Sequence, residues 1–211
     1  MPAFEDHPIV YQSFAVIDQE IGEHDLSPEG YAVVRRVIHA TADFEFKKLL
    51  RFSDDAIAAT SMALQAGCPI VTDVGMVAQG LRRIVRETFQ NPVIAAIEHA
   101  PKSPLPDQTR TEAGLLRCAQ QYPHALFVIG NAPTALLALC RQVSEGTVHP
   151  SLVVGAPVGF INVIESKQAL SDLEIPRIWV AGRKGGSGVA AAIVNALVIL
   201  AWERGMGDGY G

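Results

Sequence analysis

The chain has 211 residues, of which 49% are hydrophobic and 18% are charged. This composition excludes a disordered protein, and the length fits a single domain over residues 1–211. The 17 Lys and Arg against 22 Asp and Glu give a net charge of -5, which argues against a nucleic-acid-binding protein because phosphate neutralisation requires a basic surplus.

Residues 1–68 are expected to form a mainly helical N-terminal portion. Apolar residues recur at mostly helical spacing over His7–Glu23. A second helix is predicted to begin after Ser27, which has the short polar side chain that N-cap positions favour and is followed by proline. A third helix is predicted over Asp54–Ala66, with Ser53 as its cap.

Residues 69–211 alternate short apolar runs with longer amphipathic stretches, and this alternation predicts an α/β core. Near-continuous β-branched runs that are joined by helices are typical of parallel strands buried on both faces. The sequence therefore predicts a doubly wound, five-stranded parallel sheet that follows the N-terminal helical portion. The expected strands are Pro69–Val74, Val93–His99, Ala125–Gly130, Ser151–Ala156 and Arg177–Gly182.

The chain is expected to be cytoplasmic and not to span a membrane. Its most apolar run, Val189–Trp202, has about 14 residues, fewer than the roughly 20 that cross a bilayer, and predicts a buried helix. Met1–Asp6 lacks the basic and apolar regions of a secretory leader. The cysteines are too scattered for a disulfide framework or a metal site, which is typical of a reducing compartment; they are Cys68, Cys118 and Cys140.

The residues that follow the predicted strands are chemically the richest part of the sequence. Right-handed crossovers place the carboxyl ends of parallel strands along one edge of the sheet, where α/β proteins bind ligands. The proline-rich segment Ala100–Gln108 follows the second strand, so we interpret it as an active-site loop. Asn131 is expected to cap the helix that starts near Pro133.

The segment Gly182–Gly188, after the last strand, is the clearest candidate anion site. It combines Arg183, Lys184 and Ser187 with glycines at the start of a helix, where free backbone N–H groups and the helix dipole favour phosphate or carboxylate. Two other interpretations stay open. The glycines also fit close packing of the helix on the sheet, and Gly186–Ala191 fits the glycine pattern of a dinucleotide site.

His39 is the candidate acid–base residue. It lies near the end of the second predicted helix, whose dipole favours the imidazolium form, and Asp43 or Glu45 is expected to hold it. A histidine with a purely structural role is the alternative. The six histidines show no metal-binding spacing, so no metal site is expected.

Several segments in series resemble the precorrin-8X methylmutase family of corrin biosynthesis. They are Arg36–Phe44, Gly130–Leu136, Pro157–Phe160 with Glu165–Lys167, and Gly182–Ser187, and the likeness extends from about Tyr11 to Leu197. The resemblance implies a flavodoxin-like fold and a homodimer that works without a cofactor. It also implies an isomerase of cobalamin biosynthesis, which moves a methyl group from C11 to C12 of a tetrapyrrole substrate. That substrate is precorrin-8 or cobalt-precorrin-8, the product is hydrogenobyrinate or cobyrinate, and the motifs look more like the cobalt branch.

By the same resemblance, His39 is the catalytic histidine and Arg110 belongs to the substrate pocket. Our hypothesis is that protonated His39 donates a hydrogen bond or proton to a ring nitrogen, while cations meet the carboxylates of the macrocycle and apolar side chains line a slot for it. A non-catalytic tetrapyrrole carrier and, less favoured, a nucleotide-dependent oxidoreductase are the alternative functions. The candidate substrate-binding residues are Arg110, Thr41, Asp73, Met76, Asn131, Thr134, Phe160, Glu165, Ser166, Lys167, Arg183, Lys184, Gly185 and Ser187, with Val158 as a further lining residue.

Overall fold

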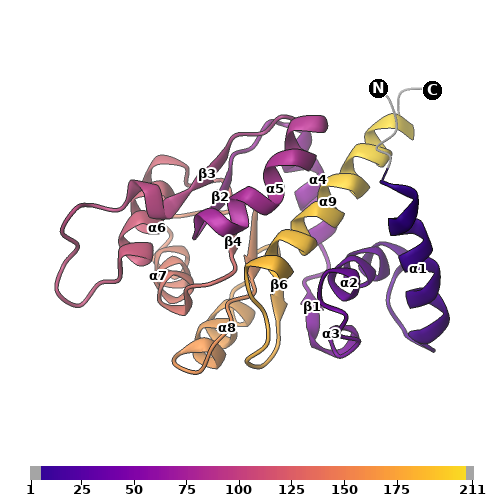
Figure 1. Cartoon of the computed structure of the whole chain (residues 1–211). Helices are drawn as coiled ribbons and strands as arrows, with labels where there is room; N and C mark the ends of the chain where they lie inside the picture. Colours follow the sequence, from indigo (N-terminus) through magenta and orange to yellow (C-terminus); the bar gives the residue numbers. More distant parts are fainter. Residues whose placement is uncertain (1–5, 208–211) are drawn as a thin grey trace.

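The five expected strands lie side by side in one parallel array in the computed structural model, which describes residues 6–207 (Figure 1). They are β2 (Ile70–Thr72), β3 (Val93–Ala95), β4 (Leu126–Ile129), β5 (Leu152–Gly155) and β6 (Arg177–Val180). Their spatial order is β3-β2-β4-β5-β6, with every neighbouring pair parallel. This is the strand order of flavodoxin-like folds, and its switch point lies between β2 and β4.

A sixth strand extends the sheet beyond the five that were predicted. β1 (Leu50–Phe52) pairs antiparallel with β6, and Arg51 lies opposite Trp179 in the register. It follows the short helix α3 (Phe46–Leu49) inside the portion that was expected to be mainly helical. Only three residues long and with a single buried side chain, β1 carries too little alternation to be recognised as a strand.

Helices cover both faces of the sheet and build two apolar clusters. One cluster lies between the sheet and α1 (Pro8–Glu20), α2 (Pro28–Thr41), α4 (Ala56–Gln65), α5 (Gly75–Glu87) and α9 (Ser187–Gly207). The other lies between the sheet and α6 (Arg110–Gln121), α7 (Pro133–Ser144) and α8 (Val163–Ser171). Strand residues therefore face apolar partners on both sides, as their continuous apolar runs indicate.

The predicted N-cap of α2 is confirmed, whereas the predicted N-cap of α4 is not. Ser27 caps α2 as expected, because its Oγ accepts a hydrogen bond from the Gly30 amide at 3.1 Å. The expected cap at Ser53 is wrong. Its Oγ donates to Asp55 and accepts from the Arg177 amide, so Ser53 ties the start of α4 to β6.

The apolar helix α9 packs through the middle of the helical layer (Figure 1). Between Ser187 and Gly205 it is long and apolar enough to cross a membrane by length and composition alone. However, 61% of its most apolar window is buried inside the protein. Contacts with α2, α4 and α5 account for this burial, which agrees with the buried helix predicted over Val189–Trp202.

Candidate active site at the carboxyl edge of the sheet

Asp73 joins the two strands that flank the switch point. It follows β2 and is fully buried, and its carboxylate accepts hydrogen bonds from four backbone amides. Burial raises the pKa of Asp73 above its ordinary value, whereas these four hydrogen bonds oppose the rise. The amides belong to Val74 at 2.9 Å, Gly130 at 3.1 Å, Asn131 at 2.7 Å and Ala132 at 2.8 Å.

The position of Asp73 changes the interpretation of two sequence candidates. Its enclosed carboxylate holds the segment after β4, so we assign Asp73 to positioning that segment rather than to touching a ligand. Ala132, not Asn131, occupies the N-cap position of α7, and the Asp73 carboxylate accepts a hydrogen bond from its backbone amide. The Asn131 side chain is thereby left exposed at the carboxyl edge, which we define as the sheet edge where β2 to β6 end.

Arg110 and Thr134 are brought together by the starts of two helices. Arg110 is the first residue of α6, and its neighbour Thr109 caps that helix by accepting from the Glu112 amide. The hydroxyl oxygens of Thr109 and Thr134 are 2.9 Å apart, which fixes α6 beside α7. The Arg110 side chain is exposed, and within residues 6–207 it forms no ion pair.

A buried lysine supports the glycine-rich segment. Lys167, on α8, is 2% exposed, and its ammonium donates to the carbonyl oxygens of Gly182 at 2.8 Å and Lys184 at 2.7 Å. Burial lowers the pKa of Lys167 to about 8. Ser166 is also buried and donates to the Val163 carbonyl. Both residues were candidates for substrate contact, and both are enclosed; only Glu165 of that motif is exposed.

Apolar side chains project from this edge into solvent. Phe160 is 82% exposed and Met76 is 74% exposed. Val158, between the end of β5 and the start of α8, is about half-exposed. The guanidinium carbon of Arg183 lies 5.8 Å from the centre of the Phe160 ring, so a cation and an aromatic ring share this surface. Ile161, which is 77% exposed, follows Phe160 directly and was not among the candidate residues.

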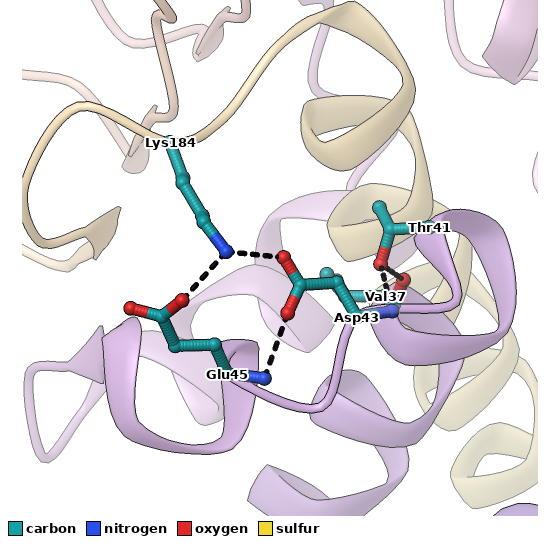
Figure 2. A network of polar contacts seen from close by, with 5 residues as sticks. All are labelled: Val37, Thr41, Asp43, Glu45 and Lys184. Atoms are coloured by element: carbon teal, nitrogen blue, oxygen red, sulfur yellow. Dashed lines mark hydrogen bonds and ion pairs between the residues drawn. The ribbon is translucent and has the colours of Figure 1, made fainter.

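His39 lies in the last turn of α2 with an exposed side chain. Its ring meets the edge of the Phe14 ring at a centroid distance of 5.4 Å. The expectation that Asp43 or Glu45 holds the imidazole is not met, because both carboxylates bind the ammonium of Lys184 instead, each at 2.6 Å (Figure 2). His39 is therefore open to a ligand.

The turn after His39 is built from side-chain hydrogen bonds (Figure 2). Thr41 donates to the Val37 carbonyl and accepts from the Asp43 amide, and Asp43 accepts from the Glu45 amide at 2.9 Å. The hydrogen bond and charge of Lys184 hold the pKa of Asp43 below its usual range, and the two carboxylates raise the pKa of Lys184. Thr41 is thus occupied in shaping the turn.

A cavity of about 270 Å³ lies between α1, α2 and α9, and Phe14, whose ring contacts that of His39, is part of its lining. It is lined by Phe14, Arg35 and Arg36 among others, and both guanidinium groups lie over the Phe14 ring, at 4.4 and 5.4 Å from its centre. This cavity was not expected from the sequence. The sequence feature that could have indicated it is Arg36, which lies three residues before His39 and therefore on the same side of α2.

Comparisons with known proteins converge on one family. Residues 8–200 match the family model described as precorrin-8X methylmutase. A cobalt-precorrin-8 methylmutase from Synechocystis sp. is 51% identical, with 95% of this chain and 98% of that protein aligned. A precorrin-8X methylmutase from Pseudomonas aeruginosa is 39% identical, with 90% and 93% aligned. The crystal structure of precorrin-8X methylmutase from Thermus thermophilus has a TM-score of 0.85 at 43% identity, covering 94% of this chain and 100% of that one.

Proposed function

Because the chain belongs to the precorrin-8X methylmutase family, we propose that its substrate is cobalt-precorrin-8 and that His39 is its catalytic acid. The protein is a methyl-shifting isomerase of cobalamin biosynthesis. The cobalt-loaded substrate is favoured because the 51% identical Synechocystis relative is named for it, whereas the Pseudomonas relative named for precorrin-8X is 39% identical.

The carboxyl edge fits a large conjugated ring that carries several carboxylates. Arg110 and Arg183 are exposed and, among the described residues, form no ion pair, so they are free to bind substrate carboxylates. Phe160, after β5, and Met76, after β2, offer exposed apolar side chains for the flat ring. The first amides of α9, from Ser187 onward, add anion-binding donors.

The observation that carries the catalytic assignment is the open imidazole of His39 at the end of α2. No described residue hydrogen-bonds to this imidazole, and the carboxylates nearest in sequence are engaged by Lys184. Protonated His39 donates a hydrogen bond or a proton to a ring nitrogen, which polarises the conjugated system toward the form from which the methyl group migrates. The methyl group stays within one molecule, and a proton that His39 donates returns to it when the product forms, so the reaction balances with no second substrate.

We further propose a cytoplasmic homodimer. Ile161 and Ile164 expose apolar surface beside Phe160, and a second copy that covers this surface would also exclude water from the ring. The cytoplasmic part of this proposal rests on the sequence, whose three cysteines are too scattered for a disulfide framework. Light scattering of the purified protein tests the dimer; a monomer at micromolar concentration would contradict it.

The decisive experiment compares His39→Ala with His149→Ala, a control at the opposite edge of the sheet. Each variant is mixed with cobalt-precorrin-8 and with precorrin-8, and the visible absorption of the product is followed. We expect His39→Ala to lose turnover by about a hundredfold or more, while it still binds product and the control behaves like the parent protein. Near-normal turnover by His39→Ala would refute the assignment, and equal rates on both substrates would refute the preference for cobalt.

A further inference from the structure

A charged contact joins the turn after α2 to the glycine-rich segment. Lys184 was a candidate for binding a substrate carboxylate, because it follows β6 at the carboxyl edge. In the structure its ammonium is already shared by Asp43 and Glu45, at 2.6 Å from each (Figure 2). Two carboxylates at this distance offset the charge of the ammonium, so the cluster as a whole has no net positive charge with which to attract an anionic ligand.

The same contact bridges two elements that carry site residues. Asp43 and Glu45 belong to the turn that directly follows His39, and Lys184 belongs to the segment that leads into α9. The backbone of that segment is held from the other side, where Lys167 binds the carbonyl oxygen of Lys184. The end of α2, the glycine-rich segment and α8 are thus connected in one chain of contacts.

We propose that Lys184 is a positioning residue: its ion pairs with Asp43 and Glu45 fix the helix end that carries His39 against the glycine-rich segment, and it does not bind the substrate. This inference rests on the proposed role of His39. Its physical basis is that acid catalysis depends on placing the donor to within a fraction of an ångström of its acceptor. Loss of the bridge lets the helix end shift while the pocket that binds the substrate stays in place.

The test compares Lys184→Met with the double variant Asp43→Asn/Glu45→Gln. If Lys184 positions His39, both variants remove the same bridge, so kcat falls in both by about tenfold and KM changes little. If Lys184 instead binds a substrate carboxylate, the two variants act in opposite directions. Lys184→Met then raises KM, and the double variant, which frees the ammonium, lowers KM.

Two further variants sharpen the result. The triple variant, with all three substitutions, should be no slower than Lys184→Met alone, because one bridge cannot be lost twice. Lys48→Met removes an exposed lysine from the neighbouring helix α3 and serves as the charge control, with parent-like kcat and KM. A raised KM at unchanged kcat in Lys184→Met, or additive losses in the triple variant, would overturn the proposal.

A measurement without substrate separates this inference from the proposed function. Amide hydrogen exchange at residues 40–46 should become faster by severalfold in Lys184→Met and in the double variant, and not in Lys48→Met. If His39→Ala kept its turnover, the catalytic role of His39 would fail, yet this exchange result would still report whether the bridge holds the turn. Unchanged exchange in both bridge variants would refute the positioning role directly.

Discussion

The carboxylate of Asp73 accepts a hydrogen bond from the backbone amide of Asn131 at 2.7 Å, across the switch point between β2 and β4. In open α/β sheets this point is a crevice in which ligands bind. Here the buried side chain of Asp73 occupies this point and fixes the backbone of the segment after β4. The Asn131 side chain is presented above it, at the surface that a ligand can reach.

Asp73→Asn should destabilise the protein by about 3 kcal/mol. The side-chain NH2 group of asparagine is a donor, so it cannot accept the backbone N–H hydrogen bonds that one oxygen of Asp73 accepts, and those buried N–H groups lose their partner. Urea unfolding followed by circular dichroism measures the loss. Asp107→Asn is the control, since Asp107 is exposed in the loop before α6, and it should stay within about 0.5 kcal/mol of the parent. Equal stability of the two variants would contradict the role of Asp73.

Gly185→Ala should destabilise the protein by about 2 kcal/mol or more and distort the glycine-rich segment. Gly185 has a φ of +152°, and a Cβ at this position would lie 2.3 Å from the Ala156 carbonyl oxygen. Gly188→Ala provides the matched control, because its Cβ would have no neighbour within 4 Å and the residue lies in α9. Alanine favours helices, so thermal unfolding should show Gly188→Ala unchanged or stabilised by up to about 1 kcal/mol. A stable Gly185→Ala variant would show that the segment has no need of glycine there.

The sequence carried enough information to predict the parallel sheet. Each of its strands is an apolar run between turn residues, and burial on both faces makes such runs continuous. The edge strand β1 was missed because Arg51 and the partly exposed Phe52 leave only Leu50 as a buried strand residue. Its pairing with β6 is a contact between segments far apart in the chain, which local patterns do not encode.

The gathering of the candidate residues at one edge of the sheet was more predictable than their individual contacts. The chemistry-bearing residues follow the strands, so topology alone gathers them at one edge. The partners of these residues could not be predicted. Lys184 binds Asp43, which is 141 residues away in the sequence. The pattern of charges does not show whether Asp43 pairs with Lys184 or with His39. The enclosed positions of Asp73 and Lys167 likewise depend on packing, because polar side chains at strand ends are more often exposed than buried.

Between about pH 8 and pH 10.5, the free energy of unfolding of the parent protein should rise relative to that of a variant without the Lys167 amine. Its pKa is lowered by burial from 10.5 to about 8, so between these values the unfolded chain binds a proton that the folded protein has released. Stability rises with pH wherever the unfolded state binds more protons. The free energy of unfolding of the parent minus that of Lys167→Met should therefore increase over this range by about 1–3 kcal/mol.

Urea denaturation at pH 7, 8, 9 and 10 tests this expectation for Lys167. Lys102→Met is the control, because Lys102 is exposed in the loop before α6 and its removal should leave the pH dependence unchanged. A difference between parent and Lys167→Met that stays constant from pH 7 to pH 10 would mean that the buried ammonium keeps its proton throughout.

Arg110→Ala should weaken binding of the tetrapyrrole product by about ten- to hundredfold without changing the stability of the protein. The side chain is exposed at the start of α6, and among the described residues it is engaged in no ion pair, so its guanidinium is available for a substrate carboxylate. Arg86→Ala is the control, because Arg86 is an exposed arginine in the last turn of α5, at the end of that helix away from the carboxyl edge, and pairs with its neighbour Glu87 at 3.8 Å. Absorption titrations with cobyrinate should separate the two variants, and the loss in Arg110→Ala should shrink at high salt. Equal affinity of Arg110→Ala and the parent would remove this residue from the site.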